Sequence, residues 1–384
     1  PQARQPDASA YFTKPDGTRI QLGDTLTNPA YAATLRRVAA EGPSAILTGP
    51  IAQAIVNRVH EGAFPSTMTL ADLAGYKPLK APALCRPYRI YVICTNNPAS
   101  SGVALLEALK ILERTDIATR GPNDPKAWMQ LAEAERLMYA DRGRYVGDPA
   151  FVPNLTAALL DPAFIAARAA LIGDRAGPPP PYGALPQAAA LGEDHTLEPS
   201  CTSHFVIVDA AGNVVSMTTT VESVFGSGRM VAGFFLNNQL TDFSFAPREA
   251  DGAPAANAVA GGKRPRSSMS PVIILDRRGR FVAALGSPGG NSILAYNLKT
   301  IVALLDWHLT MQQAIDLPNL IAAGANFTGE SAKFAPGVIP GLATLGVTLT
   351  RDGGEDSGVH GIMARPWGLE GGADPRREGV ARGY

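Results

Sequence analysis

The sequence predicts an α/β sandwich in which β-sheets lie between layers of helices. Three observations predict it. Apolar residues recur at helical spacing through the first half of the chain, paired strand-like runs follow in the second half, and a long helical pattern over residues 293–308 comes after them. Helices, then paired strands, then helices are the order expected when sheets pack against helical layers.

The helices of the first half carry start and stop signals. Asn28 suits the N-cap, Pro29 suits the first turn, and apolar residues keep helical spacing up to Gly42. A second helix stops at Gly62, and Thr69 caps a short third one. The pattern predicts helices over residues 28–42, 51–60, 69–73, 103–113, 125–142 and 162–171.

Residues 86–93 form one short strand-like run, and Cys85 and Cys94 flank it. A disulfide between the two cysteines requires this strand to double back. For a single extended strand we therefore expect two free, buried thiols.

Residues 174–201 are expected to form a linker. The four prolines at 178–181 cannot continue a helix, and the segment has few apolar residues to bury. Strands resume directly after it. Two hairpins are predicted, one from residues 204–209 and 214–220 and one from residues 272–275 and 281–285.

Length and charge exclude several classes of function. The 384 residues are enough for one large domain or two intimately packed ones. Because 34 basic side chains balance 34 acidic ones, neither nucleic acid nor an anionic membrane is an expected partner. No apolar run approaches the roughly 20 residues of a membrane span.

Thr202 stands at the junction between the linker and the first strand, where a self-cleaving precursor would place its nucleophile. Cleavage before Thr202 would give it a free α-amine, whose pKa of about 7.7–8.0 suits it as the base for the threonine's own hydroxyl. Cleavage one bond earlier would expose Cys201, an intrinsically stronger nucleophile. On these residues alone, an ordinary strand start remains the alternative.

A series of motifs extends the pattern. In order they are residues 202–209, 213–220, 225–228, 236–244, 263–271, 286–290, 374–379 and 383–384. From about Leu26 to the last residue, the series resembles the γ-glutamyltransferase (glutathione hydrolase) family. The resemblance implies a four-layer αββα sandwich of the N-terminal-nucleophile hydrolase type, with a mainly helical first half.

The resemblance also implies how the chain matures. The Thr202-Ser203-His204 triplet is similar to the family's Thr-Thr-His, which favours Thr202 as nucleophile and leaves Cys201 as the residue whose carbonyl is attacked. Residues 1–201 would then be the C-terminal portion of a large subunit, and residues 202–384 the small, catalytic subunit of a heterodimer. No cofactor or metal is expected.

The oxyanion hole is expected at Gly289 and Gly290, because glycine lets backbone amides approach a tetrahedral intermediate closely. A tight turn is the alternative, and a phosphate loop is disfavoured because the Gly-Lys-Ser/Thr ending is missing. By resemblance, these glycines supply the stabilising amides and Thr220 orients Thr202.

A γ-glutamyl donor carries an α-ammonium and an α-carboxylate, so its site needs acceptors and donors. Asp242 can bind the ammonium, and Ser267 and Ser268 can bind the carboxylate. By resemblance, Gln239 joins them in selecting the substrate. Glu222 stands where many members have an asparagine that contacts the donor's amino group.

Family members carry a further N-terminal segment, with an arginine for the donor carboxylate, that does not precede Pro1 here. Arg229 and Arg264 are possible substitutes only in the loosest sense, and γ-glutamyl binding is expected to be weaker without the family's arginine. Residues 243–263 are shorter than in members with a covering lid and lack the lid tyrosine. Residues 1–384 include no recognisable signal region, and family resemblance alone implies a periplasmic or extracellular location.

The expected function is that of an autoprocessed threonine hydrolase or transferase acting on γ-glutamyl amides through a γ-glutamyl-enzyme. One alternative is an acylase of glutaryl or cephalosporin type, which an open site would suit. The other is an inactive, truncated remnant with no enzymatic activity.

Overall fold

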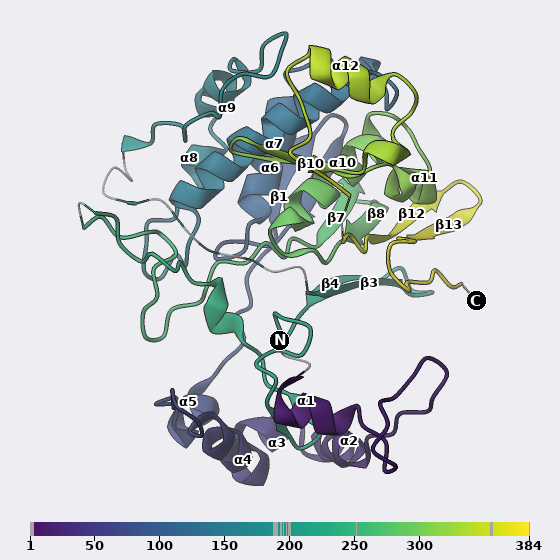
Figure 1. Ribbon diagram of the computed structural model, residues 1–384. Helices are drawn as coiled ribbons and strands as arrows, with labels where there is room; N and C mark the ends of the chain where they lie inside the picture. Colours follow the sequence, from purple (N-terminus) through teal and green to yellow (C-terminus); the bar gives the residue numbers. More distant parts are fainter. Residues whose placement is uncertain are drawn as a thin grey trace. The chain divides into compact units, whose positions relative to one another are not determined.

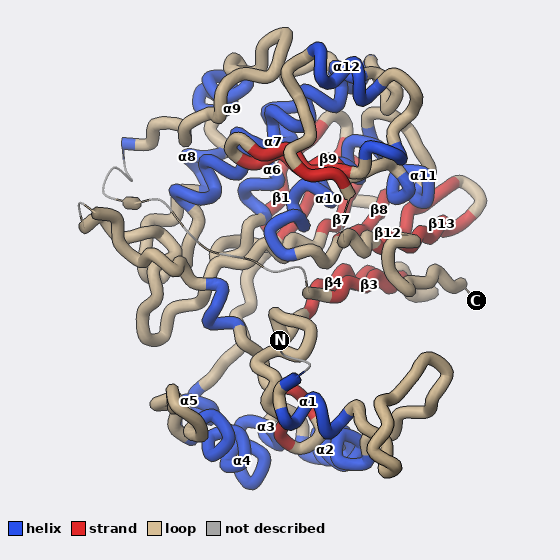
Figure 2. Tube along the Cα trace, in the orientation of Figure 1, coloured by secondary structure: helices blue, strands red, loops and turns tan. Residues whose placement is uncertain are grey.

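The computed structural model describes residues 4–186, 191–192, 194, 196, 198, 201–250, 252–353 and 356–383. The chain forms two compact units. Unit 1 comprises Pro1–Ala81 and Thr220–Gln239, and unit 2 comprises Pro82–Thr219 and Leu240–Tyr384. Figure 2 shows the strands gathered in unit 2, whereas unit 1 is almost entirely helix and loop.

Unit 1 is built on short helices, and the predicted cap begins the longest of them. Asn28 Oδ1 accepts a hydrogen bond from Tyr31 N at 2.8 Å, and Pro29 occupies the first turn. Asn28 Nδ2 also donates to Gly233 O at 2.8 Å, which ties the two segments of the unit together. The elements are α1 (Pro6–Tyr11), α2 (Pro29–Glu41), α3 (Ser44–Leu47), α4 (Gly49–Val59), α5 (Leu70–Gly75), β5 (Met230–Val231) and β6 (Phe234–Phe235).

Unit 2 is organised around a six-stranded sheet in the order β1-β2-β7-β8-β12-β13. Every neighbouring pair in it is antiparallel. The strands are β1 (Leu84–Tyr88), β2 (Tyr91–Thr95), β7 (Val272–Asp276), β8 (Phe281–Gly286), β12 (His360–Arg365) and β13 (Gly368–Ala373). The predicted second hairpin is the central β7–β8 pair, while β12 and β13 were not predicted.

Helices cover one face of this sheet and a second sheet covers the other (Figure 1). The helices are α6 (Gly102–Leu112), α7 (Pro125–Tyr145) and α10 (Ile293–Leu305), and α10 is buried along its whole length. On the opposite face, the hairpin of β3 (Ser203–Val208) and β4 (Val214–Thr219) packs against β8 and β12. Unit 2 therefore has helix, sheet and sheet layers in succession.

Smaller elements complete unit 2. They are α8 (Thr156–Leu159), α9 (Pro162–Ala169), α11 (Met311–Asp316), α12 (Val338–Thr344), β9 (Leu320–Ala323), β10 (Asn326–Gly329), β11 (Arg351–Asp352) and the 3-10 turns η2 (Ile117–Thr119), η5 (Gly290–Ser292) and η6 (Ser331–Lys333). A further turn, η4 (Gln239–Asp242), begins at the last residue of unit 1.

The prediction of two free cysteines is wrong, because residues 84–95 form a hairpin and not one strand. The chain reverses at Arg89, which has a positive φ of 54°. The reversal sets Cys85 directly opposite Cys94 in the β1–β2 register, and the two residues form a disulfide. The sequence has no Gly or Asn at this turn to signal the reversal.

The predicted linker falls only partly within the described residues. Residues 174–185 form neither helix nor strand, whereas residues 187–190, 193, 195, 197, 199 and 200 lie outside the described part. The two compact units do not coincide with residues 1–201 and 202–384, because a unit is defined by packing and a subunit by a broken peptide bond. That division stays a prediction.

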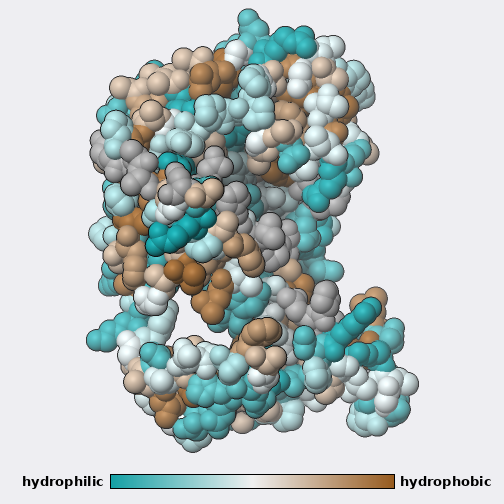
Figure 3. Space-filling model, turned by 60° about the vertical axis from the view of Figure 1, so that its left-hand side comes forward, coloured by the Kyte–Doolittle hydropathy of each residue, from teal (hydrophilic) through white to brown (hydrophobic). Residues whose placement is uncertain are grey.

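Hydrophobic residues lie interspersed with hydrophilic ones on the face drawn in Figure 3. On the β3–β4 hairpin, several apolar side chains on the face opposite buried His204 are exposed, among them Ile207 at 53% and Met217 at 46%. Within the described residues, no helix has the length and apolarity needed to cross a membrane.

Candidate active site

Thr202 lies directly before β3, and Cys201 precedes it; both are half-buried. The carbonyl oxygen of Thr202 accepts a hydrogen bond from Arg377 Nη1 at 3.2 Å. In the β3–β4 register the last pair is Ser203 with Thr219, so Thr202 and Thr220 are the next residues along each strand. The predicted nucleophile therefore stands at the end of a paired strand, at the sequence position that cleavage would turn into an N-terminus.

His204 fixes this end of β3 against the six-stranded sheet. The ring is buried, its Nδ1 lies 2.9 Å from Thr218 Oγ1, and a Cβ added at Gly286 would overlap it. Burial, with a smaller contribution from His360, lowers the pKa of His204 to about 3. The imidazole is therefore neutral at physiological pH and packs at the end of β8, where the predicted oxyanion loop begins.

We predict that this buried, neutral histidine makes stability depend on pH. The unfolded chain binds a proton at His204 below about pH 6.5 and the folded chain does not, so the contribution is complete above 6.5 and falls as the pH drops toward 3. The loss should be about 1.4 kcal/mol for each pH unit. Urea denaturation of wild type and His204→Gln at pH 7 and pH 5 measures this loss. The free energy of unfolding of wild type should exceed that of His204→Gln by less at pH 5 than at pH 7. An equal difference at the two pH values contradicts the prediction.

Gly289 and Gly290 form a buried turn between β8 and α10. Their φ angles are 132° and 55°, and a Cβ on Gly289 would lie 2.5 Å from the ring of Tyr296, so only glycine fits there. The turn stands at the N-terminal end of α10, where backbone N–H groups lack helical partners and the helix dipole favours negative charge. The geometry suits an oxyanion.

Helix α7 holds the residue that follows these glycines. Tyr139 Oη donates to Asn291 O at 2.7 Å, and Arg142 Nη1 donates to Asn291 Oδ1 at 2.8 Å. Two side chains one turn apart on α7 thus fix the loop from both the backbone and the side chain of Asn291.

Ser267 and Ser268 lie in the loop before β7, and the loop before α6 fixes their backbone. Ser267 N donates to Ala99 O at 3.1 Å, and Ser101 Oγ donates to Ser267 O at 2.7 Å. Ser268 is 3% exposed, and its hydroxyl accepts from Arg142 Nη2 at 2.6 Å. One of the two predicted carboxylate-binding serines, Ser268, thus meets the guanidinium that also holds Asn291.

The group around Ser268, which we call the carboxylate cluster, consists of Arg142, Glu198, Ser268, Arg266 and Asp194. Arg142 Nη2 lies 2.6 Å from Glu198 Oε1, Arg266 Nη2 lies 3.3 Å from the same oxygen, and Ser268 Oγ donates to Glu198 Oε2. Arg266 also pairs with Asp194. Burial alone would raise the pKa of Glu198, but the two guanidiniums and the hydroxyl hold it below its usual range.

Asp242 joins this cluster through a buried asparagine. Its backbone oxygen accepts from Asn257 Nδ2 at 2.6 Å, while Asn257 Oδ1 accepts from Arg266 N at 2.8 Å. Asp242 is 4% exposed and Asn257 is fully buried. The predicted ammonium-binding residue is therefore linked, through one side chain, to the predicted carboxylate-binding loop.

Three of the predicted residues belong to unit 1, where they contact one another. Glu222 N donates to Thr220 Oγ1 at 2.8 Å, and Gln239 Nε2 donates to Glu222 Oε2 at 3.1 Å. Glu222 is 6% exposed and has a positive φ of 77°. The orientation of Thr202 by Thr220 stays a prediction.

Of the candidate substitute arginines, Arg229 donates to the backbone oxygens of Arg58, Val59 and Glu61 within unit 1. Arg264 contributes its backbone N–H to Asp148 at 2.8 Å. Sequence reasoning missed Arg142, the buried guanidinium that meets Ser268. Its helical surroundings gave no signal, because both of its site contacts lie more than a hundred residues away in the chain.

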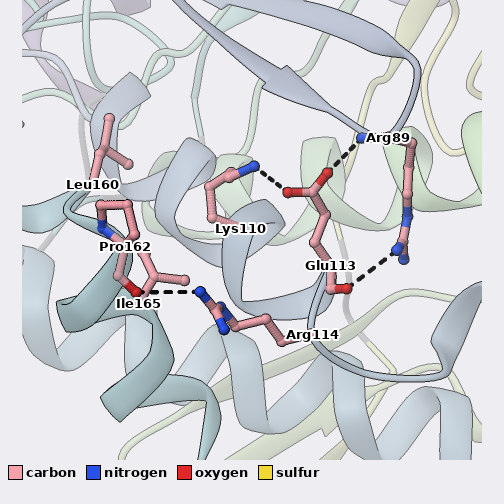
Figure 4. A pocket seen from close by; sticks show the side chains of 7 residues that line it. All are labelled: Arg89, Lys110, Glu113, Arg114, Leu160, Pro162 and Ile165. Atoms are coloured by element: carbon pink, nitrogen blue, oxygen red, sulfur yellow. Dashed lines mark hydrogen bonds and ion pairs between the residues drawn. The ribbon is translucent and has the colours of Figure 1, made fainter.

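A cavity of about 410 Å³ opens elsewhere in unit 2, and the site residues take no part in it (Figure 4). Within the lining, Lys110 pairs with Glu113 and Arg114 Nη2 donates to Pro162 O at 3.2 Å, while Arg89 pairs at 3.0 Å with Asp306, which lies outside the lining. Leu160 and Ile165 complete the lining. We assign this cavity no part in the chemistry.

Comparison with known proteins finds relatives that are named as glutathione hydrolase or acylase proenzymes. The chain is 34% identical over 321 residues to the glutathione hydrolase proenzyme of Bacillus subtilis (strain 168), covering 80% of this chain and 52% of the relative. It is 32% identical over 392 residues to that of Escherichia coli (strain K12), and 33% identical over 382 residues to the acylase ACY 1 proenzyme of Pseudomonas sp. (strain SE83). Each of these two alignments covers 98% of this chain and 65% of the relative.

The chain thus spans about half to two thirds of the length of these relatives. Among solved structures, the cephalosporin acylase from Bacillus halodurans superposes with a TM-score of 0.83 at 24% identity, covering 98% of this chain and 66% of that one. This likeness confirms the predicted α/β fold class. The sequence model of the gamma-glutamyltranspeptidase family matches residues 2–384, and the chain belongs to that family.

Proposed function

We propose that the protein is an autoprocessed threonine hydrolase or transferase that cleaves γ-glutamyl amide bonds in glutathione-like donors. One observation carries the proposal: Arg142 contacts both Ser268 in the carboxylate cluster and Asn291 beside the Gly289-Gly290 turn. A γ-glutamyl donor needs a carboxylate pocket and an oxyanion hole a few ångströms apart, and one guanidinium joins the two candidates.

In the proposed reaction, the free α-amine of Thr202 takes the proton of its own hydroxyl, and Oγ attacks the γ-carbonyl carbon. The amides of Gly289 and Gly290 stabilise the oxyanion. The C–N bond then breaks, the leaving amine takes the proton, and a γ-glutamyl ester remains on Thr202. Water or the amine of an amino acid or peptide attacks that ester and regenerates the enzyme.

The other residues select and orient the donor. The carboxylate of Asp242 binds the α-ammonium, Gln239 takes part in donor selection, and Glu222 contributes a further negative charge. Ser267 and Ser268 bind the α-carboxylate. Thr220 orients the hydroxyl of Thr202.

Maturation would leave residues 1–201 and 202–384 as the two subunits of a heterodimer. The Cys85–Cys94 disulfide favours a periplasmic or extracellular location, because disulfides persist in oxidising compartments. No metal or cofactor enters the proposed reaction.

The acylase reading has one specific observation in its favour. A relative that is 33% identical and aligned over 98% of this chain is named an acylase. A glutaryl amide carries the carboxylate of a γ-glutamyl amide without its ammonium, so the same carboxylate-binding groups would serve it.

The purified chain, incubated and run on a denaturing gel with N-terminal sequencing, tests maturation. We expect fragments of residues 1–201 and 202–384, the second beginning with Thr202. A fragment that begins with Cys201 would move the nucleophile by one residue. A single intact band after prolonged incubation, with no hydrolysis of a γ-glutamyl anilide, would favour the inactive remnant.

A further inference from the structure

In the carboxylate cluster, the negative charges that neutralise the two arginines come from the segment just before the predicted cleavage site. Arg142 and Arg266 are each only 3% exposed as side chains, and their carboxylate partners among the described residues are Glu198 and Asp194. Both acids lie on the N-terminal side of Thr202, within eight residues of it. Cleavage before Thr202 would therefore break the peptide bond that ties the segment carrying both negative charges to β3.

The contacts around Glu198 are those that a substrate carboxylate needs. One oxygen accepts from both guanidiniums and the other accepts from the Ser268 hydroxyl, so each oxygen is satisfied by a charged or polar donor. Guanidinium groups match carboxylates in geometry and charge. Thr202 follows Glu198 by four positions, a stretch of chain that spans at most about 14 Å, which places the pocket within reach of the proposed nucleophile.

We propose that Glu198 occupies the substrate's carboxylate pocket in the uncut chain, and that cleavage before Thr202 vacates it so that Arg142 and Ser268 hold the carboxylate of the donor. This inference rests on the proposed function and deepens it. It names Arg142 as a specificity-determining residue, and it makes the precursor's own glutamate a built-in blocker of the site.

The charge balance explains why the vacated pocket would take up an anion. Burial and the neighbouring Arg266 already lower the pKa of Arg142. Two buried guanidiniums left without carboxylates would carry a large desolvation cost, which an incoming carboxylate removes. The pocket therefore selects donors that bear a carboxylate, whether or not they also bear an ammonium.

Binding to uncut protein tests the first half of the proposal without catalysis. Thr202→Ala keeps the full chain uncut, and Glu198→Ala in that background empties the pocket. Calorimetry should then show L-glutamate and glutarate binding at least tenfold more tightly to the double variant than to Thr202→Ala alone, with neutral glutaramide binding to neither. Adding Arg142→Gln should remove the gain.

Glu198→Gln is the matched control, because its amide fills the same space and should leave the pocket blocked. Circular dichroism confirms that each variant is folded. A folded Thr202→Ala/Glu198→Ala protein that binds L-glutamate no better than Thr202→Ala would overturn the proposal, as would a gain that survives Arg142→Gln.

Kinetics of the cleaved enzyme test the second half. Arg142→Lys should raise KM about 10- to 100-fold for γ-glutamyl and glutaryl anilides, which carry the carboxylate, and leave KM for 4-aminobutanoyl anilide, which lacks it, unchanged. A change in kcat through Asn291 would be shared by all three donors. Arg136→Lys, on the same helix and equally buried but bonded to Gly324 O and Gly177 O, should alter none of these ratios.

The two hypotheses fail in different ways. If Thr202→Ala is still cleaved or active, the proposed function is wrong, yet the binding of L-glutamate to the emptied pocket can still be measured on the uncut fraction. If the chain matures and turns over as proposed but KM rises equally for all three anilides in Arg142→Lys, the role of Arg142 is wrong while the function stands.

Discussion

Thr202→Ala should abolish both cleavage of the chain and turnover of γ-glutamyl anilide. Each reaction needs a hydroxyl at residue 202: in maturation it attacks the carbonyl of Cys201, and in turnover it attacks the donor. Alanine has no nucleophilic atom, so turnover should fall by roughly a thousandfold or more, as expected when a nucleophile is removed. Thr202→Ser keeps the hydroxyl and should retain part of both activities.

The neighbouring hydroxyl provides a matched control. Ser203 is exposed and pairs with Thr219 in the β3–β4 register, so Ser203→Ala should be cleaved and active at near wild-type rates. Gel electrophoresis and mass spectrometry follow cleavage, and the anilide assay follows turnover. Normal processing of Thr202→Ala would show that another residue is the nucleophile.

Asp242→Asn should weaken γ-glutamyl donors far more than glutaryl donors. Asparagine keeps the shape but loses the charge that binds the α-ammonium, and a charge-assisted hydrogen bond contributes about 1.5–3 kcal/mol. KM for γ-glutamyl anilide should therefore rise about 10- to 100-fold. Glutaryl anilide has no ammonium and should change little.

Both anilides are to be measured on the same preparation, so that any loss of folded protein cancels in the ratio. Asp306→Asn is the control, because Asp306 is equally buried in unit 2 but pairs with Arg89 and Tyr88. An equal loss for both donors in Asp242→Asn would mean that Asp242 does not read the ammonium, and the acylase reading would then replace the γ-glutamyl one.

Local signals were sufficient where the contacts are local. The cap at Asn28, the helix that begins at Pro125 and the hairpin after Thr202 all follow from neighbouring residues, and the structure contains them at nearly the predicted bounds. The turn at Arg89 was missed because a positive φ at arginine has no sequence signature. β12 and β13 were missed because their Gly-rich runs lack the apolar alternation of a strand.

In the candidate site, too, residues in a local motif were predicted, whereas residues brought in by long-range contacts were not. Ser268 was expected from its motif, but Arg142 comes to it across 126 residues of sequence, and Glu198 across 70. Nothing in a helical pattern distinguishes a buried functional arginine from a solvated one. Such contacts depend on how α7 packs, and sequence periodicity carries no information about that.

The Cys85–Cys94 disulfide also bears on how the protein avoids self-association. It lies in β1, at an open edge of the six-stranded sheet, where unpaired backbone groups can template pairing with a second molecule. A slip of one residue in this short hairpin would turn every side chain of β1 to the opposite face, and the covalent bond between Cys85 and Cys94 forbids it. Pro87, which has no N–H to donate, therefore stays at its place in the edge strand. The disulfide thus fixes which backbone groups of the edge strand β1 face other protein molecules in a concentrated solution.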